Sequence, residues 1–65
     1  MKDILKKFKG KTIRLYTISG VESYVGVLDS VNERYVTLKD AMHDELMYIA
    51  VQFIESFHES RTSKA

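Results

Sequence analysis

Apolar and polar residues alternate along the first half of the chain with the two-residue period of β-strands. Ile13 and Leu15 alternate with polar neighbours and predict a first strand over 11–18. Ser19 and Gly20 form a turn, and a second strand follows from about 22 to 31. A polar break at 32–34 separates it from a third strand near 35–39. The pattern therefore predicts three consecutive short strands joined by turns.

Gly26 interrupts the long second strand in the middle of an apolar-rich run. A glycine there has no side chain to pack, and it usually marks a bulge, a sharp bend or a close backbone approach. Strongly bent strands are what a small barrel needs, because flat sheets do not close. The glycine therefore predicts a small, strongly curved barrel.

The C-terminal half predicts a fourth strand over 45–51 and a fifth over 52–58. A helix across this region is the main alternative because Leu, Met, Ala and Gln are good helix formers. The cluster of β-branched and aromatic residues favours strands. Both strands are too apolar for one small barrel to cover, so we expect edge pairing between copies. The residues predicted to form this oligomer interface are Met47, Ile49, Val51, Phe53 and Ile54.

The N-terminal segment predicts a short helix over 3–9, with Asp3 as its cap and Gly10 at its C-terminal end. One stripe of this helix is apolar and consists of Ile4, Leu5 and Phe8. A helix this short is unstable alone, so its apolar stripe must dock on the rest of the fold. An open end of the barrel is the expected docking site.

These elements predict a mostly β fold in which a short N-terminal helix precedes a five-stranded, strongly bent antiparallel SH3-like barrel. A single domain spans 1–58, with the barrel over 11–58, and 59–65 is expected to be a flexible polar tail. A chain of 65 residues buries only about 60% of its unfolded surface. Since there is no Cys to form disulfides, oligomerisation is the expected source of extra stability.

The net charge of +1 conceals an uneven distribution along the chain. Residues 1–20 carry six basic residues and one acid, whereas 21–59 carry eight acids and two basic residues. This segregation predicts one basic face and one acidic face. The basic helix face would consist of Lys6, Lys7, Lys9 and Lys11. These lysines could contact phosphates without sequence preference, or could simply solubilise the helix surface.

Several kinds of chemistry lack the residues that they need. The chain has no Cys nucleophile and no Gly-rich phosphate loop, and His43 and His58 are far apart in the sequence. We therefore expect no enzyme, no metal site and no cofactor. The absence of Cys fits a reducing compartment, and no apolar run is long enough to span a bilayer. The expectation is a cytoplasmic protein with no membrane partner.

Three groups of residues carry a family resemblance across 3–57. Gly10-Lys11, Ile13, Leu15 and Gly20 form the first group, Tyr24, Gly26, Leu28 and Asn32 the second, and Asp40-Ala41 the last. In type and order they resemble the Sm/LSm family, which includes bacterial Hfq. The resemblance implies a homo-oligomeric ring in which the fourth strand of one subunit pairs with the fifth strand of the next. It also implies RNA as the partner.

The loop that this family turns toward its pore contains Asn32, Arg34 and Tyr35. Arg can hold a phosphate or a base edge, Asn can hydrogen-bond a base, and Tyr can stack on one. The resemblance thus implies an RNA-binding site at these three residues. The alternative is a polar hairpin tip in which Tyr35 packs on a neighbouring strand.

The chain also departs from the family at informative positions. Tyr48-Ile49-Ala50 stands where Sm proteins have Ile-Arg-Gly and Hfq has Tyr-Lys-His, Asn32 replaces an Asp, and one residue is inserted between Gly20 and Tyr24. The leading hypothesis is a ring-forming protein that binds single-stranded RNA through its basic helix face and pore loops. The alternative is an oligomeric protein-interaction scaffold ring that has lost the uridine site.

Overall fold

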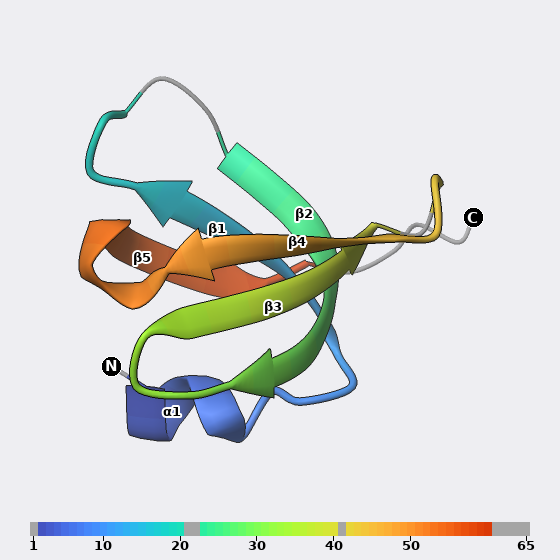
Figure 1. Cartoon of the computed structure of the whole chain (residues 1–65), viewed down its shortest axis with the longest axis horizontal. Coiled ribbons are helices and arrows are strands. Elements are labelled where there is room, and N and C mark those ends of the chain that lie inside the picture. Colours follow the sequence, from blue (N-terminus) through green and yellow to red (C-terminus); the bar gives the residue numbers. More distant parts are fainter. Residues whose placement is uncertain (1, 21–22, 41, 61–65) are drawn as a thin grey trace.

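The computed structural model describes residues 2–20, 23–40 and 42–60. Its elements are, in chain order, α1 (Lys2–Lys6), β1 (Thr12–Thr17), β2 (Ser23–Val31), β3 (Tyr35–Asp40), β4 (Glu45–Ala50), the 3-10 turn η1 (Val51–Phe53) and β5 (Ile54–Glu59). The strands form one antiparallel sheet in the order β4-β3-β2-β1-β5. Figure 1 shows the sheet curling strongly, with α1 across one end.

The predicted mostly β architecture is confirmed at the level of one short helix and five antiparallel strands. The sheet is not closed, because β4 and β5 lie at its two edges and do not pair with each other. The predicted tail beyond Ser60, Ala41 and the inserted stretch at 21–22 lie outside the described residues. Within the described part of the chain, no helix is long and apolar enough to cross a membrane.

The core lies on the concave side of the sheet, and the alternating pattern of β1 explains its composition. Ile13 and Leu15, which share one face of β1, point inward and are fully buried. The other buried apolar residues come from every remaining element except η1: Leu5, Leu28, Val36, Leu38, Ile49 and Ile54. Burying one such side chain contributes roughly 1.5–3 kcal/mol, so this small core is the main source of stability for the chain.

Gly26 lies where the backbone of β3 approaches β2 closely. A Cβ atom built on this glycine would lie 2.7 Å from the main-chain oxygen of Lys39. Three residues later, a register shift between Leu28 and Ser30 makes Asp29 the extra residue of a bulge. The predicted close approach is thus confirmed at Gly26. The long curve of β2 in Figure 1 combines this approach with the separate bulge.

The helix is shorter than the predicted 3–9 and ends at Lys6. The chain continues in tight turns to Gly10, whose φ of +86° is accessible to glycine at little cost. The Gly10 amide donates to the Leu28 oxygen over 2.8 Å. This bond attaches the turn to β2. The position at which β1 begins is therefore set by the turn as well as by the helix.

The apolar stripe predicted on the helix docks through two of its three members. Leu5 is fully buried in the core, and the Phe8 ring meets the edge of the Phe57 ring with centroids 5.3 Å apart. Ile4, in contrast, is 54% exposed. The helix ends at Lys6, so Phe8 lies in the turns that follow and does not continue the helical stripe that Ile4 and Leu5 begin.

Two of the residues predicted for an oligomer interface lie inside the chain instead. Ile49 and Ile54 are buried in its own core, and Met47 and Val51 pack partly against that core. These four residues therefore pack against the core of their own chain, and their place in an interface between copies stays a prediction. Only Phe53 keeps an exposed side chain, at 49%. The exposed apolar residues of β4 are Leu46 and Tyr48.

Candidate nucleic-acid interface

The turn between β2 and β3 is shaped by the side chain of Asn32. Its Oδ1 accepts hydrogen bonds from the amides of Arg34 and Tyr35, both over 2.7 Å. The Asn32 amide in turn donates to the Tyr35 oxygen over 2.9 Å. This is an Asx-turn, in which the side chain mimics a backbone turn. The Asn32 carbonyl is thus committed to holding the loop, which leaves its NH2 group as the possible base contact.

The same turn is hydrogen-bonded to the connection between β4 and β5. The Val51 amide donates to the Arg34 oxygen over 2.8 Å. The two loops together enclose a pocket of about 400 Å³. Its lining consists of Glu33, Arg34, Tyr35, Ala50, Val51 and Gln52. Two of the three predicted loop residues therefore share one concave site, and we call it the loop pocket.

Gln52 is a member of the loop pocket that sequence reasoning did not single out. It is the central residue of η1 and is exposed. Its amide offers both donors and an acceptor, which suits the edge of a nucleic-acid base. The available signal was a lone polar residue within the apolar run from Tyr48 to Ile54. The sequence does not reveal this turn, because its pattern predicts two adjoining strands over 45–51 and 52–58.

Tyr35 lines this pocket and is the exposed first residue of β3. Its ring meets the edge of the Tyr48 ring with centroids 6.5 Å apart. Tyr35 is 46% exposed and Tyr48 is 66% exposed. The packing on a neighbouring strand that formed the alternative for Tyr35 is therefore confirmed. The contact fixes the ring, and its exposed surface remains accessible for stacking.

A second hollow, about 300 Å³ in volume, lies between the helical segment and the end of β2. Lys6, Lys9, Ser30 and Val31 line it, and we call it the basic groove. All four predicted lysines are exposed, but only Lys6 and Lys9 reach this groove. Two ammonium groups and a hydroxyl are suitable donors for a phosphate.

The basic groove and the loop pocket flank the same turn. Ser30 and Val31 line the groove immediately before Asn32, and Glu33 begins the lining of the pocket immediately after it. In Figure 1, α1 lies next to this turn. The lysines of the basic groove and the polar and aromatic groups of the loop pocket therefore lie on either side of one turn.

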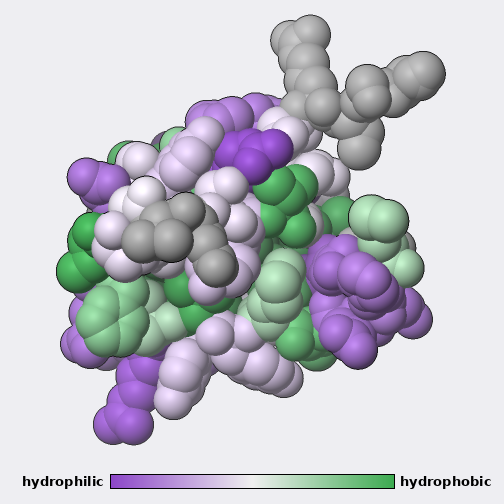
Figure 2. Space-filling view, turned by 90° about the horizontal axis from the view of Figure 1, so that it is seen from above, coloured by the Kyte–Doolittle hydropathy of each residue, from purple (hydrophilic) through white to green (hydrophobic). Residues whose placement is uncertain are grey.

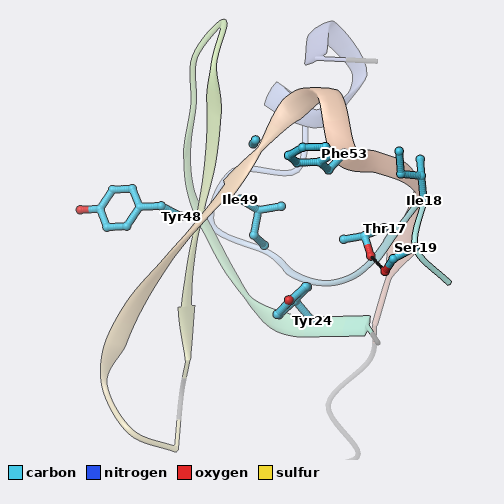
Figure 3. Close-up of a pocket in the computed structure, with 8 residues that line it drawn as sticks. Thr17, Ile18, Ser19, Tyr24, Tyr48, Ile49 and Phe53 are labelled. Atoms are coloured by element: carbon cyan, nitrogen blue, oxygen red, sulfur yellow. Dashed lines mark hydrogen bonds between the residues drawn. The ribbon is translucent and has the colours of Figure 1, made fainter. Parts of the chain in front are cut away.

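A third pocket, of about 300 Å³, is mainly apolar (Figure 3). Its lining includes Ile18, Tyr24, Ile49 and Phe53, with the hydrogen-bonded hydroxyls of Thr17 and Ser19 at one side. Figure 3 shows the Tyr48 ring pointing away from the other residues drawn. We call this site the edge pocket because β4 supplies part of its wall. The edge pocket offers an apolar side chain a place to dock. Figure 2 shows that hydrophobic and hydrophilic residues are mixed on the surface of the molecule.

A cluster of charges lies at the β3–β4 hairpin, at the opposite end of β3 from the loop pocket. Lys39 Nζ lies 3.0 Å from Asp44 Oδ1. Asp40 Oδ2 lies 2.9 Å from His43 Nδ1, and Asp40 Oδ1 accepts from the Met42 amide over 2.9 Å. These hydrogen bonds lower the pKa of Asp40 from its ordinary value of 3.8, and the bond with His43 has the largest effect. The cluster stabilises the hairpin and lies away from the candidate interface.

Titration of Asp40 should be visible as a carboxyl carbon shift in NMR spectra. Because the folded state lowers its pKa, Asp40 contributes stability above pH 3.8 that is lost as the pH falls through the lower, folded value. We expect a midpoint below 3.8, and a shift back toward 3.8 in the His43→Ala variant. A midpoint that does not respond to His43→Ala would show that the histidine contact is absent in solution.

The described residues contain no group of three or more His, Asp or Glu side chains placed to hold a metal ion. Compared with protein-family models, with curated proteins and with solved structures, the chain matches none. The functional interpretation therefore depends on the loop pocket, the basic groove and the sheet edges.

Proposed function

We propose that this chain assembles into a ring of identical copies that binds single-stranded RNA. The observation that carries the proposal is the position of the loop pocket next to the basic groove. Arg34, Tyr35 and Gln52 offer charge, an aromatic face and an amide in one place. Lys6 and Lys9 add positive charge on the other side of the same turn. This combination matches single-stranded RNA, which presents phosphates and unstacked bases together.

The sheet edges support the proposed assembly. β4 and β5 are the outermost strands, so each leaves one row of backbone groups without a strand partner among the described residues. Such edges invite pairing with another chain. If β4 of one copy pairs with β5 of the next, the contact is head-to-tail and closes into a ring when the rotation permits. The resemblance to the Sm/LSm family implies the same pairing, and the edge pocket could receive an apolar side chain of the neighbouring copy.

Repetition around a ring compensates for the weakness of each site. A single arginine, tyrosine and glutamine on an exposed surface bind a nucleotide weakly. Several copies on one assembly turn later contacts with the same RNA strand into intramolecular events, which raises the overall affinity. The proposal therefore requires a strand long enough to contact more than one copy.

RNA binding is tested by fluorescence anisotropy with a labelled single-stranded RNA at low and moderate salt. We expect salt-sensitive binding that is lost when Lys6, Lys7 and Lys9 are all replaced by Glu. For single strands the logarithmic salt dependence changes by roughly 0.7 for each phosphate contact. As matched single changes, Lys9→Glu should weaken binding and Lys39→Glu, at the distant hairpin, should not. Equal effects of these two variants would exclude the basic groove as the phosphate contact.

The loop pocket has its own pair of variants. Tyr35→Leu should weaken RNA binding by about tenfold, because stacking on an aromatic ring contributes roughly 1–3 kcal/mol per base. Tyr35→Phe keeps the ring and should bind like the unaltered protein. If both variants bind normally, bases do not stack at this position.

One observation favours a second candidate, a scaffold ring for protein interactions. Ile49 occupies a position where the resembling proteins carry a basic residue, and it is buried here. A preparation with the mass of several 7.5 kDa chains but no RNA binding even at low salt would support the scaffold and reject the RNA proposal.

A further inference from the structure

The outer face of β1 carries polar groups that the proposed function does not use. Arg14 and Tyr16 alternate with the buried Ile13 and Leu15 and so point away from the core. His58 of β5 is the register partner of Arg14, and Ser23 of β2 is the register partner of Tyr16. We call Arg14, Tyr16, Ser23 and His58 the outer cluster. It shares no residue with the loop pocket, the basic groove or the edge pocket.

Hydrogen bonds connect the outer cluster in two pairs. Arg14 Nη1 donates to Ser23 Oγ over 2.8 Å. Tyr16 Oη lies 3.3 Å from His58 Nε2, and the two rings are 5.8 Å apart at an angle of 35°. Serine thus holds the guanidinium while four of its five N–H groups remain for another acceptor. The described part of the chain shows no acid in an ion pair with Arg14.

The main-chain contact of His58 decides its tautomer. Its Nδ1 lies 3.2 Å from the carbonyl oxygen of Glu59. A carbonyl oxygen only accepts, so this contact favours the tautomer in which Nδ1 carries the hydrogen. In the neutral ring Nε2 is then the acceptor, and the hydrogen of the Tyr16 hydroxyl points at it. In this state the hydroxyl has no hydrogen left for a ligand.

Protonation of His58 reverses that last bond. Nε2 then donates to Tyr16 Oη, and the hydroxyl hydrogen must turn outward. The cluster also gains a second positive charge next to Arg14, and like charges directly across two strands repel. A bound anion would relieve the repulsion and accept the freed hydroxyl hydrogen. Two acids of β5 lie near His58 in the sequence. Glu59 is the register partner of Ile13, which points to the other face of the sheet, and Glu55 lies in the register shift between β1 and β5.

We propose that the outer cluster binds the doubly charged phosphate group of a phosphate monoester, and that protonation of His58 tightens this binding. Arg14 donates N–H bonds to the phosphate oxygens, the Tyr16 hydroxyl donates a third bond, and protonated His58 supplies the second charge. Two positive charges match a doubly charged monoester better than the singly charged phosphodiester of an RNA backbone. By linkage, the anion must favour protonated His58 as much as protonation favours the anion.

Sulfate is a suitable probe because it stays doubly charged at both pH values of the test. Amide NMR shifts of the full chain are followed during titration with sodium sulfate at pH 5.5 and at pH 8, with chloride at equal ionic strength as reference. We expect shifts centred on β1 and β5 and an affinity about tenfold higher at pH 5.5, because a protonated His58 would add a second positive charge to the site. No sulfate shifts beyond those caused by chloride would overturn the proposal.

Three variants separate a built site from general attraction. Arg14→Gln should lower sulfate affinity at both pH values by about tenfold, and His58→Gln should remove the pH dependence. Lys39→Gln removes one exposed positive charge elsewhere and should change neither. A Lys39→Gln effect equal to that of Arg14→Gln, or dimethyl phosphate binding as tightly as sulfate, would reject the monoester site. If Arg14→Gln fails to fold, persistent pH dependence in His58→Gln still rejects it. None of these results bears on RNA binding through Lys6, Lys9 and Tyr35.

Discussion

Replacing Gly26 with alanine should destabilise this protein by about 3 kcal/mol, and valine should prevent folding. The added Cβ would lie 2.7 Å from the Lys39 oxygen. That atom belongs to the backbone of β3, which is paired with β2 on one side and β4 on the other, so it cannot move aside as a flexible side chain would. A chain of this size has a free energy of unfolding on the order of 5 kcal/mol, most of which the alanine would remove. Urea denaturation followed by circular dichroism measures the effect.

Gly10→Ala is the matched control for Gly26→Ala. Nothing lies within 4 Å of a Cβ at Gly10, and its cost comes only from the φ of +86°, about 1–2 kcal/mol. We therefore expect the Gly10 variant to fold and to unfold cooperatively at a somewhat lower urea concentration. If Gly26→Ala proves the more stable of the two, β2 and β3 do not approach as closely in solution as described.

Ile49→Lys and Phe53→Lys should fail in different ways. Ile49 is buried in the core, so a lysine there places a charge among apolar side chains and should cost more than about 4 kcal/mol. The Ile49 variant is expected to be unfolded. Phe53 is 49% exposed at the edge pocket, so its lysine variant should keep the fold and lose the proposed assembly.

Circular dichroism together with sedimentation velocity distinguishes these outcomes. The Phe53→Lys variant should give a folded spectrum and the mass of one 7.5 kDa chain, whereas the unaltered protein should sediment as a larger assembly. Phe53→Leu keeps the apolar character and serves as control. A Phe53→Lys variant that sediments like the unaltered protein would place the contact between copies away from the edge pocket.

The strands of the first half could be predicted from the sequence because their two faces differ. Ile13 and Leu15 alternate with polar neighbours, and the burial of β1 follows that alternation. The bulge at Asp29 could not be predicted in the same way. It shifts the register by one residue inside a strand that has apolar side chains on both faces. The alternation of residues there does not indicate which face points to the core.

The second half shows where pattern alone fails. Every residue of β4 from Leu46 to Ala50 is apolar, so the sequence does not tell which ones face inward. In the structure the Ile49 side chain is buried in the core and the Tyr48 side chain is exposed. For the same reason the short turn at Gln52 was assigned to a strand. The role of the Gln52 side chain follows from the tertiary structure, because the hydrogen bond from the Val51 amide to the Arg34 oxygen joins the two loops that form the loop pocket.

The 3-10 turn η1 has a mechanical consequence for any assembly. Only Val51–Phe53 separate β4 from β5, yet these strands form the two opposite edges of the sheet. The angle between incoming and outgoing neighbours would therefore be set by a hinge of three residues. If the chain forms the proposed ring, lengthening this connection by one residue should change how many subunits complete the circle, or convert the circle into an open spiral.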